Sequence, residues 1–235
     1  MKRLCSVCAR GGSKGVPNKN IRPLLGKPLL IYSLDQARQS DLFDCIVVSS
    51  DSKEILQLAE EWGVDHAIER PEELATDFAA KIPVFQHCFQ TAETLSGMTF
   101  DIAVDLDATS PLRNQDDLKG VVDLLESHDS TTNVITGTTA RRSPYFNLVE
   151  LDEIGRVYLS GKRQNDVKAI VRRQDAPQCY DMNASIYAWW RESLLNTTDH
   201  VIQFGTRLYL MPEERSVDID SELDFRWVEF LMNNE

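Results

Sequence analysis

Residues 3–20 read RLCSVCARGGSKGVPNKN, and this stretch decides the fold. The apolar run 3–9 predicts a buried β-strand, and the segment 10–22, rich in glycine, lysine and asparagine, predicts the loop that follows it. In open α/β folds, ligands bind in the loops beyond the carboxyl ends of the strands. The stretch therefore indicates both a first strand and the place where a ligand binds.

The rest of the chain alternates short apolar runs with segments of helical period. We expect strands at 44–50, 101–106, 132–137 and 184–190. One helix is expected from Pro28 to about Arg38, and a second begins after an Asp51 cap and has Ile55, Leu58, Ala59 and Trp62 at helical spacing. Further helices are expected over 81–95, around Leu118, Val121, Val122 and Leu125, and after a capping box of Ser221 and Asp224. The last helix is expected to carry Leu223, Trp227 and Leu231. Such alternation predicts an α/β fold with a mostly parallel, Rossmann-like sheet.

The domain organisation follows from the same rhythm. Residues 1–235 read as a single domain, because no linker or internal repeat interrupts them. Residues 139–182 break the alternation: they are rich in Arg, Gln, Asp and Tyr and contain a hairpin-like turn at 153–156. We expect this segment to be an excursion from the core sheet.

Composition excludes several classes of protein. With 42% hydrophobic residues the chain has ample material for a core, so it is not disordered as a whole. The balance of 25 basic against 37 acidic residues gives a net charge of −12, which argues against general binding to nucleic acids or anionic membranes. No run reaches the ~18 apolar residues of a membrane span, and the first residues show no signal peptide, so we expect a cytoplasmic protein.

The five cysteines are odd in number and irregularly spaced. Cys5 and Cys8 form a C-x-x-C pair, which suggests zinc or redox chemistry, but they lie inside an apolar run and no second pair follows. We therefore interpret them as buried strand thiols in a reducing compartment.

The loop after the first strand carries the strongest chemical signal. Glycines 11, 12 and 15 allow backbone amides to approach an anion, and Arg10, Lys14 and Lys19 supply positive charge. The loop therefore predicts a triphosphate cradle, although it is neither a Walker A motif nor a G-x-G-x-x-G motif. The alternative is a flexible glycine turn with solvated lysines.

Two further segments carry polar residues that suggest a site. In the run 216–221, Asp218 and Asp220 lie two residues apart and point the same way if the chain is extended, so they could share a Mg²⁺ ion. They could equally be solvated aspartates before the last helix. The run 105–113 ends a strand with small hydroxyl residues and Arg113, which fits either a ligand rim or a capped turn with a solvated arginine.

Five blocks in this order carry a family resemblance: ARGGSKGVPNKNIRPLLGKPLL, ERPEELATD, TSPLR, NASIY and SVDIDSELD. The chain resembles the acylneuraminate cytidylyltransferases (CMP-sialic acid synthetases), and the blocks span nearly its whole length. The resemblance implies a fold of the sugar nucleotidyltransferase type that joins CMP from CTP to a nine-carbon keto acid sugar with Mg²⁺. It also implies a homodimer in which the excursion is the dimerisation segment and reaches the partner's sugar site.

The resemblance also implies roles for individual residues. Arg10, Gly12, Ser13 and Lys14 match residues of the loop that holds the CTP phosphates, and Lys19 and Asn20 match the end of that loop. Arg70 matches an arginine on the nucleotide side, and Asp218 and Asp220 match the magnesium ligands. The residues that match the sugar site are Asp107, Thr109, Ser110, Arg173, Asn183 and Tyr187. Lys14, Arg10 and Asp220 are the residues expected to be catalytic. The four scattered histidines (66, 87, 128 and 200) suggest no general base, so the identity of the base stays open.

The departures from the family pattern lie at the sugar end. Sialic acid enzymes typically read Leu-Gln-Pro-Thr-Ser-Pro where this chain has Asp107 in place of the amide. An expected lysine becomes Phe146, and an expected aromatic pair becomes Val201-Ile202. Members of the family that act on legionaminic acid have a similar Asp-Leu-Asp run, which favours that type of acceptor. The alternatives are sialic acid, another keto acid such as Kdo or pseudaminic acid, or a non-catalytic nucleotide-binding module.

The phosphate loop gives the first testable prediction. Lys14→Ala is expected to retain the fold, because a loop lysine contributes little to packing. It is expected to lose about a hundredfold in pyrophosphate release from CTP, since one phosphate contact in a transition state contributes about 3 kcal/mol. Activity within twofold of the parent protein would exclude this role for Lys14.

Overall fold

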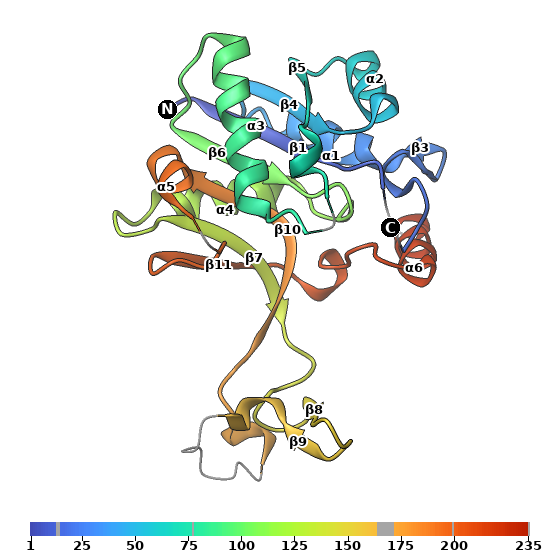
Figure 1. Ribbon diagram of the computed structural model, residues 1–235, viewed down its shortest axis with the longest axis vertical. Helices are drawn as coiled ribbons and strands as arrows, with labels where there is room; N and C mark the ends of the chain where they lie inside the picture. The colour runs from blue at the N-terminus through green and yellow to red at the C-terminus, as the bar shows by residue number, and fades with distance from the viewer. Residues whose placement is uncertain (13–14, 77, 164–171, 199, 235) are drawn as a thin grey trace.

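The computed structural model describes residues 1–12, 15–76, 78–163, 172–198 and 200–234 (Figure 1). The central sheet consists of β1 (Arg3–Cys8), β4 (Cys45–Ser50), β5 (His66–Glu69), β6 (Ile102–Leu106), β7 (Asn133–Thr139), β10 (Tyr180–Trp190) and β11 (Thr206–Leu210). Their order is β11-β7-β10-β6-β1-β4-β5. β10 is antiparallel to both of its neighbours, and the other pairings are parallel. The expected α/β fold with a mostly parallel sheet is confirmed.

Helices cover both faces of this sheet. The helices are α1 (Leu29–Gln39), α2 (Lys53–Trp62), α3 (Lys81–Ser96), α4 (Gln115–Glu126), α5 (Arg191–Asn196) and α6 (Glu222–Asn233). Side chains of α1, α2 and α4 pack on one face of the sheet, and those of α3 and α5 pack on the other. Successive residues of a strand point to opposite faces, so Leu4 of β1 packs with α3 while Cys5 packs with α1. The predicted helices and strands agree with these bounds to within a few residues, except that β10 begins at Tyr180.

Some short elements carry too weak a periodic signal to be predicted. They are β5, α5, β11 and a small two-stranded sheet of β2 (Pro23–Leu24) and β3 (Lys27–Pro28). No helix in the described part of the chain is long and apolar enough to cross a membrane.

The helix caps agree only partly with the prediction. The capping box of Ser221 and Asp224 begins α6 as expected. The N-cap of α2 is Ser52, whose hydroxyl accepts from the amide of Ile55, and not Asp51. The Asp51 carboxylate instead accepts a hydrogen bond of 2.9 Å from the amide of Gly11, so it ties the loop after β1 to the end of β4.

Only some of the apolar side chains of α6 are buried. Phe225 and Val228 are buried, whereas Leu223 is 76% exposed and Trp227 is 49% exposed. The reason is that α6 packs on the region that leads into α1 and on its own preceding loop, not on the sheet. Leu231 is partly buried there.

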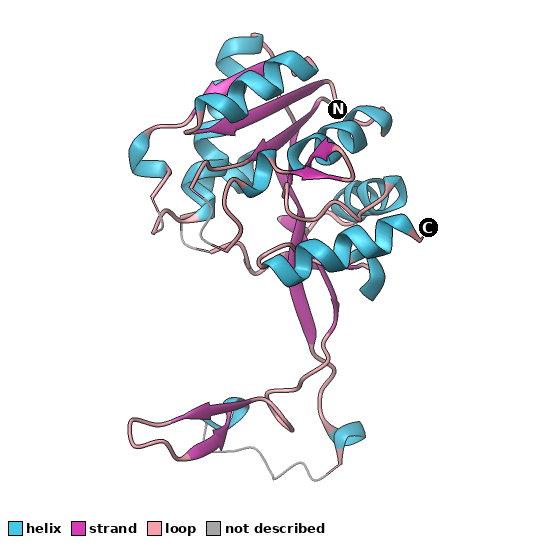
Figure 2. Ribbon diagram, turned by 90° about the vertical axis from the view of Figure 1, so that its right-hand side faces the viewer, coloured by secondary structure: helices cyan, strands magenta, loops and turns pink. Residues whose placement is uncertain are grey.

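The excursion leaves the core between β7 and β10. These two strands pair through Thr139 and Tyr180 and carry the chain away from the body of the molecule, as Figures 1 and 2 show. At the far end, β8 (Val149–Leu151) and β9 (Val157–Leu159) form an antiparallel hairpin. Gly155 has φ +81° in the connecting turn, a conformation that favours glycine, so the expected hairpin turn is confirmed.

Candidate active site

A cavity of about 520 Å³ opens beyond the carboxyl ends of β1 and β6. The sheet grows outward from β1 in both directions, with β4 and β5 on one side and β6 on the other. Such a reversal of strand order leaves a crevice in which open α/β sheets bind ligands. The described residues that line the cavity include four cationic side chains, Arg10, Lys19, Arg70 and Lys81, and four carboxylates, Asp105, Asp107, Asp218 and Asp220.

The loop after β1 forms one wall of the cavity. The side-chain amide of Asn20 donates to the carbonyl of Arg10 at 3.0 Å, while the Oδ1 atom of Asn20 is buried and has no hydrogen-bond partner within the described residues. A buried acceptor without a partner is costly, so this atom is suited to a donor on a ligand. Arg70 enters the cavity from the end of β5, where its guanidinium donates to the carbonyl of Ser49 at 2.9 Å.

The first loop is held directly against the C-terminal acidic loop. The Lys19 Nζ atom donates to the carbonyl of Ile219 and lies 3.3 Å from Asp220 Oδ1. A Cβ atom at Gly15 would be 1.9 Å from the carbonyl oxygen of Asp220, so only glycine allows this approach. The two loops, about two hundred positions apart in the sequence, thus form one rim of the site.

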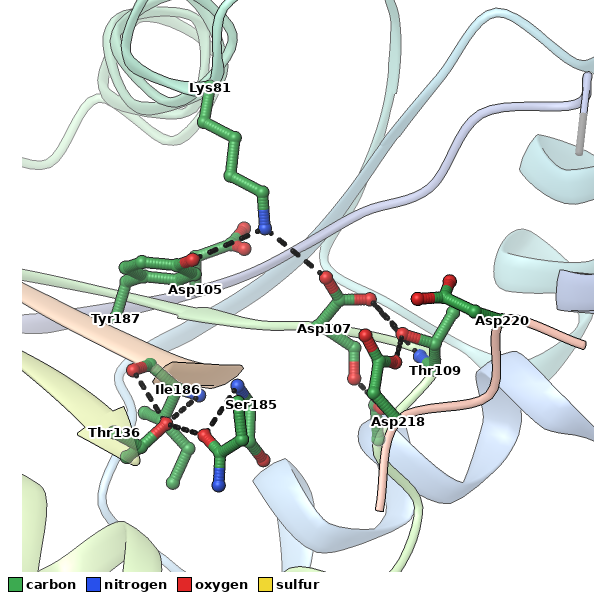
Figure 3. A network of polar contacts seen from close by, with 12 residues as sticks. Lys81, Asp105, Asp107, Thr109, Thr136, Ser185, Ile186, Tyr187, Asp218 and Asp220 are labelled. Atoms are coloured by element: carbon green, nitrogen blue, oxygen red, sulfur yellow. Dashed lines mark hydrogen bonds and ion pairs between the residues drawn. The ribbon is translucent and has the colours of Figure 1, made fainter. Parts of the chain in front are cut away.

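The acidic loop brings Asp218 and Asp220 into the cavity (Figure 3). The Thr109 hydroxyl contacts Asp218 Oδ1 and lies 2.8 Å from Asp107 Oδ1, and the Ile219 amide donates to the Thr109 carbonyl at 3.0 Å. Burial, followed by the nearby carboxylate of Asp107, raises the pKa of Asp218 to about 6. Two carboxylates that face open space fit Mg²⁺, which takes one or two protein carboxylates and completes its shell with phosphate oxygens and water.

The opposite wall holds a second charged cluster, drawn in Figure 3. Lys81 Nζ lies 3.4 Å from Asp107 Oδ2 and 3.4 Å from the Tyr187 hydroxyl. Burial raises the pKa of Asp107, but Lys81 and the two hydrogen bonds from Thr109 lower it more, so the net pKa is below the ordinary value. Asp105 is buried and accepts a hydrogen bond of 2.7 Å from Ser6, and burial raises its pKa to about 6.

The structure agrees with neither of the two alternatives expected for Arg113, because its side chain is not solvated and it does not line the cavity. It is 2% exposed. Its guanidinium donates to the carbonyls of Asp107 at 2.8 Å and Ser185 at 2.9 Å, and to the Ser33 hydroxyl. Burial lowers the pKa of Arg113 to about 10, with partial compensation from Asp107. A buried cation that holds two carbonyls fixes the end of β6 relative to β10, and so positions Asp107.

The structure brings most of the predicted residues together. Arg10, Lys19, Asn20, Arg70, Asp107, Thr109, Asp218 and Asp220 all line the cavity. Ser13, Lys14 and the side chain of Arg173 lie outside the described residues, so their roles stay predictions. Gly12 lies in the exposed part of the first loop, outside the lining.

Three predicted sugar-site residues are buried beside the cavity and do not line it: Ser110, Asn183 and Tyr187. Asn183 Oδ1 instead accepts from Thr136 and from the amide of Ser185, and so holds an irregularity in the pairing of β10 with β7. The residue that this irregularity presents to the cavity is Ala184, in the left-handed region at φ 55°.

The substituted residues at the predicted sugar end also lie elsewhere. Phe146 is part of the excursion, and Val201 packs in the core on the α3 side of the sheet. Ile202 is 56% exposed. Within the described residues none of the three lines the cavity, so they supply no apolar surface to an acceptor bound in this protomer's site.

Two residues of the site were missed by the sequence reasoning, Lys81 and Asp105. One signal was available for Lys81: it begins a predicted helix, where the helix dipole disfavours a cation. A lysine in that position is a reason to look for a partner elsewhere in the fold. Asp105 could have been noticed as a charged residue inside an otherwise apolar strand, because buried carboxylates need a specific environment.

Comparison with known proteins decides the family. The model of the cytidylyltransferase family matches residues 4–226. This chain belongs to that family. It is 44% identical over 232 residues to the post-translational flagellin modification protein B of Campylobacter coli, covering 99% of this chain and 95% of that protein. It is also 44% identical over 230 residues to a CMP-N,N'-diacetyllegionaminic acid synthase of Campylobacter jejuni, covering 98% of this chain and 94% of that protein.

The fold of this cytidylyltransferase matches a solved structure of CMP:2-keto-3-deoxy-manno-octonic acid synthetase complexed with CTP. The TM-score is 0.69 at 16% identity, and the match covers 100% of this chain and 99% of that one. At this identity the likeness shows the shared fold.

The buried carboxyl of this cytidylyltransferase gives a pH-dependent prediction. The pKa of Asp105 is about 6 in the fold and about 4 in an unfolded chain, so the native state binds the extra proton between these values. Its contribution to stability is therefore complete below about pH 4 and is lost as the pH rises through 6. The difference in unfolding free energy between Asp105→Asn and wild type is therefore expected to shift in favour of the variant by roughly 2 kcal/mol when the pH is raised from about 4 to about 7.5.

Urea unfolding at both pH values measures this change. Asp123→Asn, at an exposed position of α4, is the matched control and is expected to show little change between the two pH values. An equal effect of Asp105→Asn at both pH values would contradict a raised pKa at Asp105.

Proposed function

We propose that this protein transfers CMP from CTP to the anomeric hydroxyl of a nonulosonic acid and releases pyrophosphate. The observation that carries the proposal is the single cavity in which Arg10 and Lys19 of the first loop meet Asp218 and Asp220 of the last. Cations and a magnesium-type carboxylate pair around one cavity suit a nucleoside triphosphate. Membership of the cytidylyltransferase family supports CTP as that nucleotide, and the name of the C. jejuni relative supports a nonulosonic acid as the acceptor.

In the proposed reaction the sugar hydroxyl attacks the α-phosphorus of CTP in line, and pyrophosphate leaves. Phosphoryl transfer needs mainly positioning and charge stabilisation from the protein. Arg10 and Lys19 are close enough to the cavity to offset negative charge on the phosphates, and Asn20 offers its unpartnered oxygen to a ligand donor. Lys14 is proposed to act with them on the same loop.

We propose that Asp218 and Asp220 hold Mg²⁺. When bound, the ion would neutralise phosphate charge and lower the pKa of the attacking hydroxyl. The chain itself prepares the pair: the Thr109 hydroxyl contacts Asp218, and Lys19 orients Asp220. The raised pKa of Asp218 fits a group whose carboxylate form gains from a bound cation.

The acceptor is proposed to be of the legionaminic type. Asp107 lies on the cavity wall with its carboxylate fixed by Thr109 and Lys81. A carboxylate there accepts hydrogen bonds, and so suits the N–H groups of acylamino substituents, of which a diamino nonulosonic acid carries one more than sialic acid. The name of the C. jejuni relative and the Asp-Leu-Asp run at 105–107 favour the same class.

We further propose a cytoplasmic homodimer. The described part of the excursion exposes apolar side chains on its hairpin, namely Leu148, Val149, Leu151, Ile154 and Val157. An extended arm with an apolar face suits docking on a second copy of the chain. Light scattering at micromolar concentration reports this assembly.

Pyrophosphate release tests the reaction. The protein is incubated with CTP, Mg²⁺ and, in turn, N,N'-diacetyllegionaminic, N-acetylneuraminic, pseudaminic and Kdo acids, with ATP, GTP and UTP as nucleotide controls. Release is expected with CTP and nonulosonic acids. CTP binding without release from any acid would favour a non-catalytic nucleotide-binding module and reject the proposal.

The metal site predicts a strict requirement for a divalent cation. Excess EDTA is expected to abolish pyrophosphate release, and Mg²⁺ to restore it. Asp220→Asn is expected to raise the Mg²⁺ concentration for half-maximal activity at least about tenfold, because it removes one charged ligand. Glu222→Gln, two residues further on and outside the lining of the cavity, serves as the control. Normal turnover in EDTA would exclude this role.

Asp107 predicts the choice of acceptor. Wild type is expected to have a higher kcat/KM for N,N'-diacetyllegionaminic acid than for N-acetylneuraminic acid, and Asp107→Gln is expected to shift the ratio toward N-acetylneuraminic acid. The reason is that an amide replaces an ionised acceptor, and hydrogen bonds to charged groups are the stronger ones. A tenfold preference of the wild type for N-acetylneuraminic acid would refute this assignment and leave the cytidylyl transfer itself intact.

A further inference from the structure

Lys81 occupies an unfavourable position that its helix does not explain. It is the first residue of α3, where the positive end of the helix dipole repels a cation. Its side chain reaches into the cavity, with Nζ 4.7 Å from the centroid of the Tyr187 ring and 3.4 Å from the carboxylate of Asp107 (Figure 3). The contacts inside the cavity, and not the helix, therefore account for a lysine in this place.

The charges around the cavity show what Lys81 does there. Lys19 lies against Asp220 in the acidic loop, and Arg70 donates to the carbonyl of Ser49. The Lys81 Nζ atom, in contrast, lies within ion-pair distance of the Asp107 carboxylate, at 3.4 Å. The proposed acceptor is an anion expected beside Asp107, so without Lys81 the carboxylate of Asp107 would repel it through a poorly screened site.

The carboxylate of Asp107 is held from two sides. One oxygen accepts from the amide and the hydroxyl of Thr109, at 3.1 and 2.8 Å. The other faces Lys81, and Arg113 holds the backbone carbonyl of the same residue. The position of Asp107 is thus fixed by buried groups. Its charge is offset mainly by Lys81, a half-exposed side chain whose removal leaves those groups in place, and less by the buried Arg113.

We propose that Lys81 is a positioning residue that sets acceptor specificity: it offsets the charge of Asp107 so that an anionic sugar acid can bind beside a carboxylate that recognises its N–H groups. This inference rests on the proposed cytidylyl transfer to a sugar acid. It assigns to Lys81 a role through Asp107, and not a contact with the reacting atoms.

A double-mutant cycle tests the inference. Wild type, Lys81→Met, Asp107→Asn and the double variant are compared by pyrophosphate release, with kcat and KM measured for CTP and for the acid that wild type uses best. Lys81→Met is expected to raise the KM for the acid about tenfold and to leave the KM for CTP within about threefold. In the Asp107→Asn background the same substitution is expected to change the KM for the acid by less than about threefold, because the carboxylate that pairs with Lys81 has lost its charge.

Two variants separate charge from fold. Lys81→Arg retains the positive charge and is expected to stay within about threefold of wild type. Lys53→Met is the matched control, because Lys53 is the exposed first residue of α2 just as Lys81 is the first residue of α3. It is expected to change neither KM.

The outcomes are distinct. If Lys81→Met leaves the KM for the acid unchanged, the inference is overturned. The proposed reaction is then still supported, provided that wild type releases pyrophosphate. The inference would also be overturned if Lys81→Met raised the KM for the acid as much in the Asp107→Asn background as it does in the wild-type background. Lys81 would then act on the acid directly. Absence of pyrophosphate release by wild type with every acid would overturn the proposed reaction, and this inference with it.

Discussion

The site depends on the close approach of the first loop to the last. Lys19 spans this junction by donating to the Ile219 carbonyl beside Asp220, and Gly15 allows the backbones to meet. The acidic loop is anchored again from β6 through Thr109, whose carbonyl accepts from Ile219. If these contacts were lost, the cationic loop and the carboxylate pair would no longer face one cavity. The position of α6, which follows the acidic loop, depends on the same junction.

Charge balance is the second constraint on this cavity. Four cationic and four acidic side chains meet there within the described residues, in a protein whose net charge is −12. Each acidic group has a specific neighbour. Ser6 holds Asp105, and Thr109 with Lys81 holds Asp107. The Thr109 hydroxyl also contacts Asp218, and Lys19 holds Asp220. Such pairing keeps several carboxylates close together in one cavity, where unpaired charges would be destabilising.

The two ends of the cavity differ in how they are built. The end that we propose for the nucleotide uses loop residues close to glycines, where the backbone itself can approach a phosphate group. The opposite end uses side chains from β6 and α3, held by the buried Arg113 and by the irregularity at Ala184 in β10. Asp107 belongs to this second end, and its partner Lys81 comes from a helix on the other face of the sheet from α1.

The sequence alone determined most of the longer strands and helices, the cationic loop, the acidic pair and the family, because apolar periodicity and short motifs are local. It also predicted the excursion and its hairpin turn. It could not decide that Arg113 is buried, that α6 buries Phe225 in place of Leu223, or that Asn183 and Tyr187 lie behind the cavity wall. Those outcomes, and the meeting of Lys81 with Asp107, depend on which elements pack together, and packing is a contact between residues far apart in the chain.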